Sequence, residues 1–150
     1  MNIRRVQLVL CIALSLLLSA CSSPSPLAVL ENGNCTDDQK ALVKKHISSQ
    51  IAAISAQDFA TAYSFAAPSF RRSIDLEQFE LIIKAQYRVL ISNQGVTFGG
   101  CLIEESAIRQ NVEVDGALQD AELAYVLEVD QLKLGVIAAT ILSGESDLKI

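Results

Sequence analysis

The stretch Ala121-Glu-Leu-Ala-Tyr-Val-Leu-Glu-Val-Asp130 decides the fold class of this protein. Leu123, Tyr125, Leu127 and Val129 alternate with neighbours that are mostly polar. Side chains of a strand point alternately to its two faces, so this pattern predicts a strand with one buried face.

Similar segments surround this strand. After a turn predicted at Gln94-Gly95, the sequence from Val96 offers four β segments of similar length. Asp115-Gly116 begins the loop before the quoted strand, and Asp130-Gln131 joins it to the last one. The last segment, residues 132–142, is almost continuously apolar, so we expect it to be covered on both faces or to lie between subunits.

Helices are predicted before the strands. Thr36 and Gln39 form a capping-box pattern, and a stripe of apolar residues at helical spacing follows it over residues 43–54. Asp58 and Asp75 are in position to cap two further helices. The sequence therefore predicts an α+β fold, in which N-terminal helices pack on one face of a curved, antiparallel, four-stranded sheet.

The N-terminus has the features of a secretory signal. Arg4 and Arg5 precede a short apolar run, and the signal ends in Leu18-Ser-Ala-Cys21, which resembles the bacterial lipobox. We expect a signal peptide over residues 1–20, a lipid on Cys21 and a Ser- and Pro-rich tether over residues 21–34, followed by one domain over residues 35–150. The alternatives are a plain anchor or a plain cleavage site.

A lipid on Cys21 implies a place in the cell envelope, on the extracytoplasmic side. Residue 22 is Ser rather than the Asp that retains lipoproteins in an inner membrane, so we expect the outer membrane in a bacterium with two membranes. In a bacterium with one, the anchor lies in the outer face of the plasma membrane. The lipid makes the membrane itself the expected partner.

Charge excludes nucleic acid as a partner. The 150 residues carry 17 acidic and 12 basic side chains, a formal charge of -5. Removal of residues 1–20 takes Arg4 and Arg5 and leaves -7. A nucleic-acid binder needs a basic face that displaces counterions from phosphates, which this composition does not favour.

Two of the four cysteines remain for a structural role. Cys11 leaves with the signal and Cys21 takes the lipid, which leaves Cys35 and Cys101 in an oxidising compartment. We expect a disulfide, with two separate buried thiols as the alternative. A single His and two distant Cys are a poor ligand set for zinc, so we expect no metal and no cofactor.

The chain resembles a small bacterial family, domain of unknown function 4864, over about residues 40–142. The resemblance rests on residues 51–58, on Ala62-Tyr-Ser-Phe-Ala-Ala-Pro68 and on the spacing of Phe79 and Tyr87. That family is similar to the nuclear transport factor 2-like (cystatin-like) superfamily of cone-shaped α+β domains. The resemblance implies the same fold class. It assigns no activity to the chain. The last strand departs from the family pattern at residues 131–134.

Little in the sequence indicates catalysis. A triad would have to include His46, the only histidine, which lies at the edge of the first helix's apolar stripe. Asp58 matches an acidic position of the family, although a role as helix cap also explains it. Arg71-Arg72 are either a site for an anionic ligand or two solvated charges. Gly99-Gly100 favours a bulge or bend in the first strand.

Cone-shaped folds enclose a pocket between the concave sheet and the helices. The candidate lining residues are Asp58, Tyr63, Phe79, Tyr87, Phe98 and Tyr125, with ordinary core packing as the alternative for each aromatic. The first hypothesis is a noncatalytic, lipid-anchored module that binds a small molecule or a protein.

Two other functions remain open. The first is an isomerase or hydratase that uses Asp58 or His46 as base and Tyr63 or Tyr87 as hydrogen-bond donor. A buried Asp58 beside a Tyr would favour this reading, whereas Asp58 capping a helix at the surface would remove it. The second is a homodimer formed through the sheet.

Overall fold

The computed structural model describes residues 24–143, in which helices occupy the first half and strands the second. The predicted signal peptide and Cys21 lie outside the described residues. In chain order the elements are β1 (Gly33–Asn34), α2 (Asp37–Ser55), α3 (Phe59–Ser64), α4 (Pro68–Arg71), α5 (Leu76–Gln86), α6 (Arg88–Ile91), β2 (Asn93–Glu104), β3 (Ala107–Gly116), β4 (Ala121–Asp130) and β5 (Lys133–Ser143).

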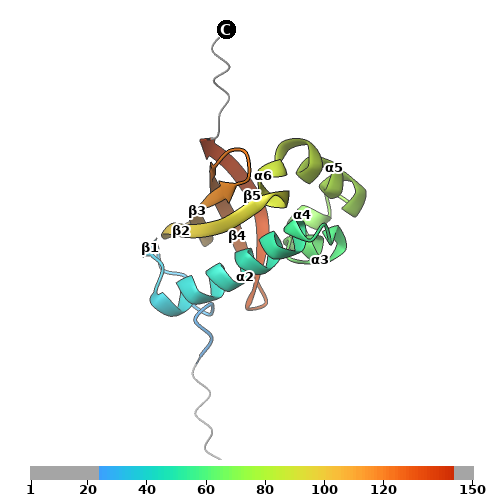
Figure 1. The fold of residues 1–150 in the computed structure, drawn as a ribbon. Coiled ribbons are helices and arrows are strands. Elements are labelled where there is room, and N and C mark those ends of the chain that lie inside the picture. Colours follow the sequence, from blue (N-terminus) through green and yellow to red (C-terminus); the bar gives the residue numbers. More distant parts are fainter. Residues whose placement is uncertain (1–23, 144–150) are drawn as a thin grey trace, which may run out of the picture.

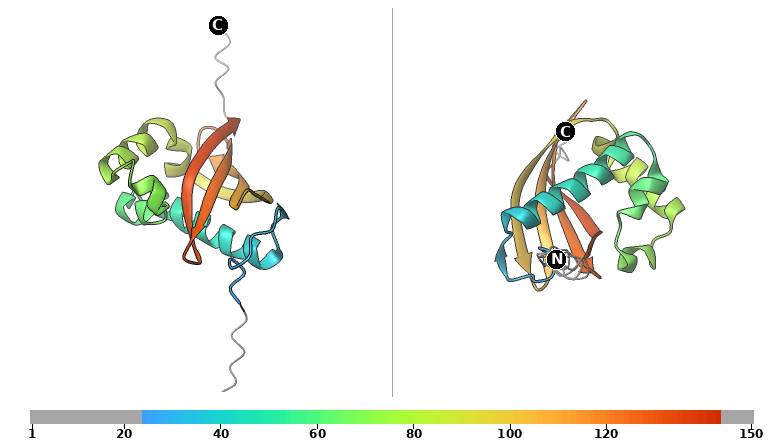
Figure 2. Two further views of the ribbon diagram at one scale, coloured as in Figure 1. Left: turned by 180° about the vertical axis from the view of Figure 1, so that it is seen from behind. Right: turned by 90° about the horizontal axis from the view of Figure 1, so that it is seen from below.

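The strands form one open antiparallel sheet in the order β1-β2-β3-β4-β5. Figure 1 shows α2 lying across one face of this sheet, while α3, α4 and α5 gather to one side, past β5. The two further views in Figure 2 agree with this arrangement. The α+β class and the order of helices before strands are therefore as predicted.

The long helix α2 begins as the sequence predicts. The Thr36 hydroxyl accepts from the backbone N–H of Gln39, and the Gln39 side chain accepts from the Thr36 N–H, so a capping box is present. One face of α2 buries Val43, Ile47 and Ile51 against the inner face of the sheet. This packing, more than intrinsic propensity, stabilises a helix in water.

The sheet has five strands, so the prediction of four was wrong. The additional strand, β1, has two residues: Gly33 pairs with Ile103 and Asn34 with Leu102. Immediately after it, the Cys35 N–H donates to the Cys101 carbonyl at 3.1 Å. Two residues are too few to show a period along the sequence, and β1 therefore depends on contacts with a segment far along the chain.

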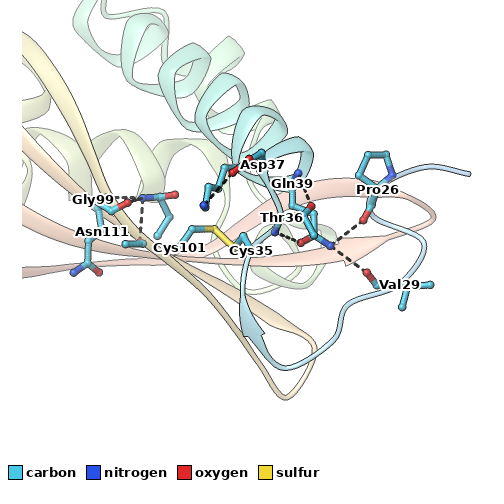
Figure 3. The surroundings of a disulfide bond; sticks show 12 residues. Pro26, Val29, Cys35, Thr36, Asp37, Gln39, Gly99, Cys101 and Asn111 are labelled. Carbon is cyan, nitrogen blue, oxygen red and sulfur yellow. Dashed lines mark hydrogen bonds and ion pairs between the residues drawn. A yellow bond between two sulfur atoms is a disulfide. The ribbon is translucent and has the colours of Figure 1, made fainter. Parts of the chain in front are cut away.

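Part of the segment predicted as a tether over residues 21–34 packs against the domain. Leu27 is buried in the core, with 6% of its surface exposed. The Gln39 side-chain amide donates to the carbonyls of Pro26 (3.0 Å) and Val29 (3.1 Å), as Figure 3 shows. Residues 24–32 contain no helix or strand, but the Ser and Pro composition could not reveal the amide that holds this segment against α2.

Strand β2 contains both glycine-containing features predicted from the sequence, a turn and a bulge. The predicted turn is not one. Gln94-Gly95, predicted as a turn, lies inside the start of β2 next to a shift in register. Gly99-Gly100 forms the expected irregularity, between Phe98 and Cys101. The buried Gln110 amide donates to the carbonyls of both glycines and to that of Asn111, so it bridges the irregularity in β2 to β3.

Strand β5 is covered over only part of its length. Val136 is buried, and its backbone pairs with the end of α3: Ala67 N–H donates to the Val136 carbonyl (2.9 Å) and Val136 N–H to the Phe65 carbonyl (3.0 Å). Towards its C-terminus, Ile141 and Leu142 are 38% and 53% exposed. The expectation that one chain covers both faces of residues 132–142 was therefore wrong. The alternative, that this strand lies between subunits, stays a prediction.

None of the helices between residues 24 and 143 combines the length and the apolar composition needed to cross a bilayer.

Candidate ligand-binding pocket

A small pocket lies where the inner face of β4 and β5 meets α5, α6 and the second half of α2. Its volume is about 90 Å³. The lining is mostly apolar and comprises Gln50, Ile54, Ala66, Phe70, Phe79, Ile82, Ile83, Tyr87, Leu90, Tyr125, Val136, Ala138 and Ala139. The pocket is smaller than the roughly 300–1,000 Å³ of pockets that enclose a whole drug-sized ligand.

The polar groups of the pocket are one amide and two phenols. The Gln50 side chain donates to the Ala62 carbonyl at 3.3 Å, and the Tyr87 hydroxyl donates to the Ala139 carbonyl at 2.5 Å. Burial raises the pKa of Tyr87. Burial also raises the pKa of Tyr125, to which the nearby Tyr87 adds. Both phenols therefore stay protonated near neutral pH and do not act as bases. The single hydroxyl proton of Tyr87 is donated to Ala139, so towards a ligand the Tyr87 oxygen can only accept.

Three of the predicted pocket residues, Phe79, Tyr87 and Tyr125, line it together. They come from α5, the junction of α5 with α6, and β4. Two others do not line it. The Tyr63 hydroxyl donates to the Ile74 carbonyl at 2.7 Å, so this side chain closes the loop between α4 and α5. Phe98 lies elsewhere on the sheet, with the Lys44 amine 5.9 Å from its ring centre.

Asp58 is not in the pocket, which corrects its assignment as a candidate. It is the exposed N-cap of α3, and its carboxylate accepts from the Thr61 N–H at 3.1 Å. The hydrogen bonds from the Thr61 side chain and backbone lower the pKa of Asp58. A proton acceptor for catalysis needs a raised pKa in a dry site, and Asp58 has the opposite environment.

His46 also lies outside the pocket. Its Nε2 is 2.9 Å from the Phe65 carbonyl, which makes Nε2–H the donor, and its ring packs edge-on against the Phe65 ring. Burial lowers the pKa of His46 below its ordinary value of 6.5, and the bond to Phe65 offsets this only in part. His46 is therefore neutral at pH 7, and it ties α2 to the end of α3.

The lowered pKa of His46 predicts that acid destabilises the fold. The unfolded chain takes up a proton near pH 6.5 and the folded protein only at lower pH, so stability is complete above 6.5 and falls as the pH drops below it. We expect His46→Gln, which keeps a donor for Phe65, to flatten this slope. Urea unfolding between about pH 7.5 and 5 measures it, and equal slopes in both proteins would contradict the assignment.

The two arginines named in the sequence analysis lie at the surface. Arg71 and Arg72 are both exposed at the end of α4. Across residues 24–143, no three His, Cys, Asp or Glu side chains come close enough together to hold a metal ion.

The sequence did not indicate Gln50 or Ala139 as pocket residues. Gln50 is on the buried side of α2, where a lone polar residue among apolar neighbours is the only signal in the sequence. Ala139 contributes a backbone carbonyl, and no pattern of side chains reveals which carbonyl a distant tyrosine will contact.

A family model described as "Domain of unknown function (DUF4864)" matches residues 36–146. The chain belongs to this family. The DUF4864 match begins at the N-cap of α2 and includes every element from α2 to β5, so the whole pocket lies within it. Residues 24–35, with β1 and Cys35, lie before the DUF4864 match. No curated protein matches the chain.

Proposed function

We propose that this DUF4864 protein is a noncatalytic binding module, held at a membrane by a lipid on Cys21, whose pocket takes a small apolar group. The supporting observation is a pocket of about 90 Å³ with a mostly apolar lining that includes the side chains of Tyr87 and Tyr125. An apolar cavity of about 150 Å³ can bind benzene or xenon. A pocket of this size therefore suits one end of a larger molecule.

The positions of the titratable groups favour binding over catalysis. The isomerase or hydratase hypothesis needs Asp58 or His46 as base. Asp58 caps α3 at the surface, and His46 donates to a carbonyl outside the pocket. Within the described part of the chain, the lining includes no carboxylate and no histidine. Its phenols can orient a ligand, but they cannot take up a proton at neutral pH.

Xenon is a suitable probe of the pocket, because it enters small apolar cavities. We expect xenon under pressure to shift the NMR methyl signals of Val136 and Ile83. Ile82 is a half-buried lining residue, so Ile82→Trp places an indole at the mouth and should abolish the shifts. Leu81→Trp is the matched control. Leu81 directly precedes Ile82 on α5, is 60% exposed and does not line the pocket. Unshifted Val136 and Ile83 signals in the parent protein would contradict the proposal.

These measurements can use the chain from Ser22 onwards. All buried apolar residues of the described chain lie between Leu27 and Val136, so the shortened chain retains the complete core.

The proposed anchor has a test of its own. The motivating observation is the sequence Leu18-Ser-Ala-Cys21 after a short apolar run. Two or more acyl chains give stable attachment, since each buried methylene contributes about 0.8 kcal/mol. We expect Cys21→Ser to move the protein from the membrane fraction to the soluble fraction of cells, with loss of the acyl mass at residue 21. An unmodified Cys21 in the parent protein would disprove the anchor.

We also propose the finer fold assignment, a nuclear transport factor 2-like cone. Three features support it: helices that precede the sheet, an antiparallel meander, and a pocket between them. A structural comparison that aligned β2 to β5 with a different topology would remove it.

A homodimer through the sheet also stays a proposal, supported by the exposed Ile141 and Leu142 of β5. Sedimentation as a monomer at all concentrations would count against it.

A further inference from the structure

We propose a second binding site, for a long-chain carboxylate, in the groove between α2 and the β4–β5 turn. Leu42 and His46 line it from α2, Leu27 from the N-terminal segment, and Phe65 from the end of α3. Leu132 and Lys133 line it from the β4–β5 turn. The groove is separate from the proposed pocket, since the two lining sets have no residue in common.

The size of the groove suits a single-chain molecule. Its volume is about 430 Å³. This value is near the lower end of the roughly 300–1,000 Å³ found for small-molecule pockets, which favours one acyl chain over the two of a phospholipid. Leucines from three separate parts of the chain, among them Leu27 and Leu42, provide an apolar lining for that acyl chain.

The charge of the groove favours an anion. Its charged lining residues within the described chain are Lys45 and Lys133, and no carboxylate lines it. This is unusual in a protein with 17 acidic and 12 basic residues. His46 is engaged through Nε2 with the Phe65 carbonyl, so the two lysines carry the positive charge. Lysines beside an apolar groove complement a molecule with an acyl chain and a negatively charged head.

The β4–β5 turn provides an independent observation. Gln131 and Leu132 have φ of 49° and 61°, the left-handed conformation that favours glycine or asparagine in a two-residue hairpin. A non-glycine residue is strained in this conformation. Leu132 is nevertheless an apolar side chain with 54% of its surface exposed, at the rim of the groove. The β2–β3 turn has the same conformation, with φ of 51° at Glu105 and 66° at Ser106, so the feature specific to the β4–β5 turn is its exposed leucine. Contact with an acyl chain gives that apolar side chain a purpose.

The test is a calorimetric titration of the chain from Ser22 onwards with decanoate below its micellar concentration, and with decanol as the uncharged analogue. We expect decanoate to bind at least tenfold more tightly than decanol. The double variant Lys45→Gln/Lys133→Gln should remove this preference. Lys44→Gln is the matched control, because Lys44 is adjacent on α2 but lies over Phe98, outside the groove. Equal affinities for decanoate and decanol would overturn the proposal.

Leu132→Gly separates a binding role from a structural one. We expect this variant to melt at a higher temperature, because the strain is relieved, and to bind decanoate at least fivefold more weakly. A stabilised variant with unchanged affinity would overturn the role of Leu132. Vesicles of phosphatidylglycerol distinguish the source of the anion: binding to vesicles without binding to decanoate would replace the carboxylate site by a membrane-contact surface. Ile82→Trp should leave decanoate binding unchanged, so this site and the proposed pocket fail independently.

Discussion

Replacing Cys35 and Cys101 together by alanine is expected to lower the free energy of unfolding by about 4 kcal/mol. The two cysteines are bonded as predicted, with their Cα atoms 5.5 Å apart and a sequence separation of 66. A disulfide stabilises chiefly by restricting the unfolded chain, and the effect grows with the length of the closed loop. Both side chains are buried, with 3% and 5% exposed, so the variant also loses core contacts.

Urea unfolding of the double variant measures this loss. The matched control is the parent protein with a reductant present, which should lose a similar amount. The reductant should have no effect on the variant. We also expect the variant to open more easily at β1 and at the segment that Gln39 holds, before the whole fold is lost. Faster hydrogen exchange at Asn34 and Cys35 would report this local opening. An unfolding midpoint equal to that of the parent protein would show that the disulfide does not stabilise the fold.

Gly135→Ala is expected to destabilise the protein by about 3 kcal/mol, because β5 and the start of α4 are too close for a side chain there. An added Cβ would lie 2.5 Å from the Cα of Ala67 and 2.8 Å from its Cβ. Relief requires Ala67 to move, which breaks its hydrogen bond to the Val136 carbonyl and weakens that of Val136 to Phe65. The same movement deforms the pocket, since Ala66 and Val136 line it.

Gly100→Ala is the matched control for this effect. An added Cβ at Gly100 would have no heavy atom within 4 Å, and the φ of Gly100 is not positive. We expect a change within about 0.5 kcal/mol, as for other exposed positions without special contacts. Thermal and urea unfolding of both variants provide the comparison. Equal effects of the two substitutions would show that the close approach of β5 to Ala67 is not important for stability.

Much of the fold could be predicted because its causes are local. A capping box needs only Thr36 and Gln39, and the caps Asp58 and Asp75 need only the helix that follows. The alternation in β4 is visible because every second residue faces the core. The pairing of Cys35 with Cys101 was predicted from the cysteines that remain after one is assigned to the predicted signal peptide and one to the predicted lipid.

The candidate site was predicted only in part. Phe79, Tyr87 and Tyr125 could be identified as aromatic residues on buried faces, and they do meet. Tyr63 has the same chemistry, but it points to the Ile74 carbonyl. Its position depends on how α3 and α4 turn relative to α5, which no local pattern specifies. The sequence allows Asp58 to be either a helix cap or an acid in the pocket. Only the position of α3 in the fold shows that it is an exposed cap.

The sequence by itself determined the α+β class, the order of the elements and the starts of the helices, because hydrogen bonds between neighbours and the periodicity of apolar residues are properties of short segments. Only the tertiary structure decided the fifth strand, the partners of Gln39 and Gln110, and which side chains enter the pocket or the groove. The physical reason is that these features depend on backbone groups brought together from distant parts of the chain.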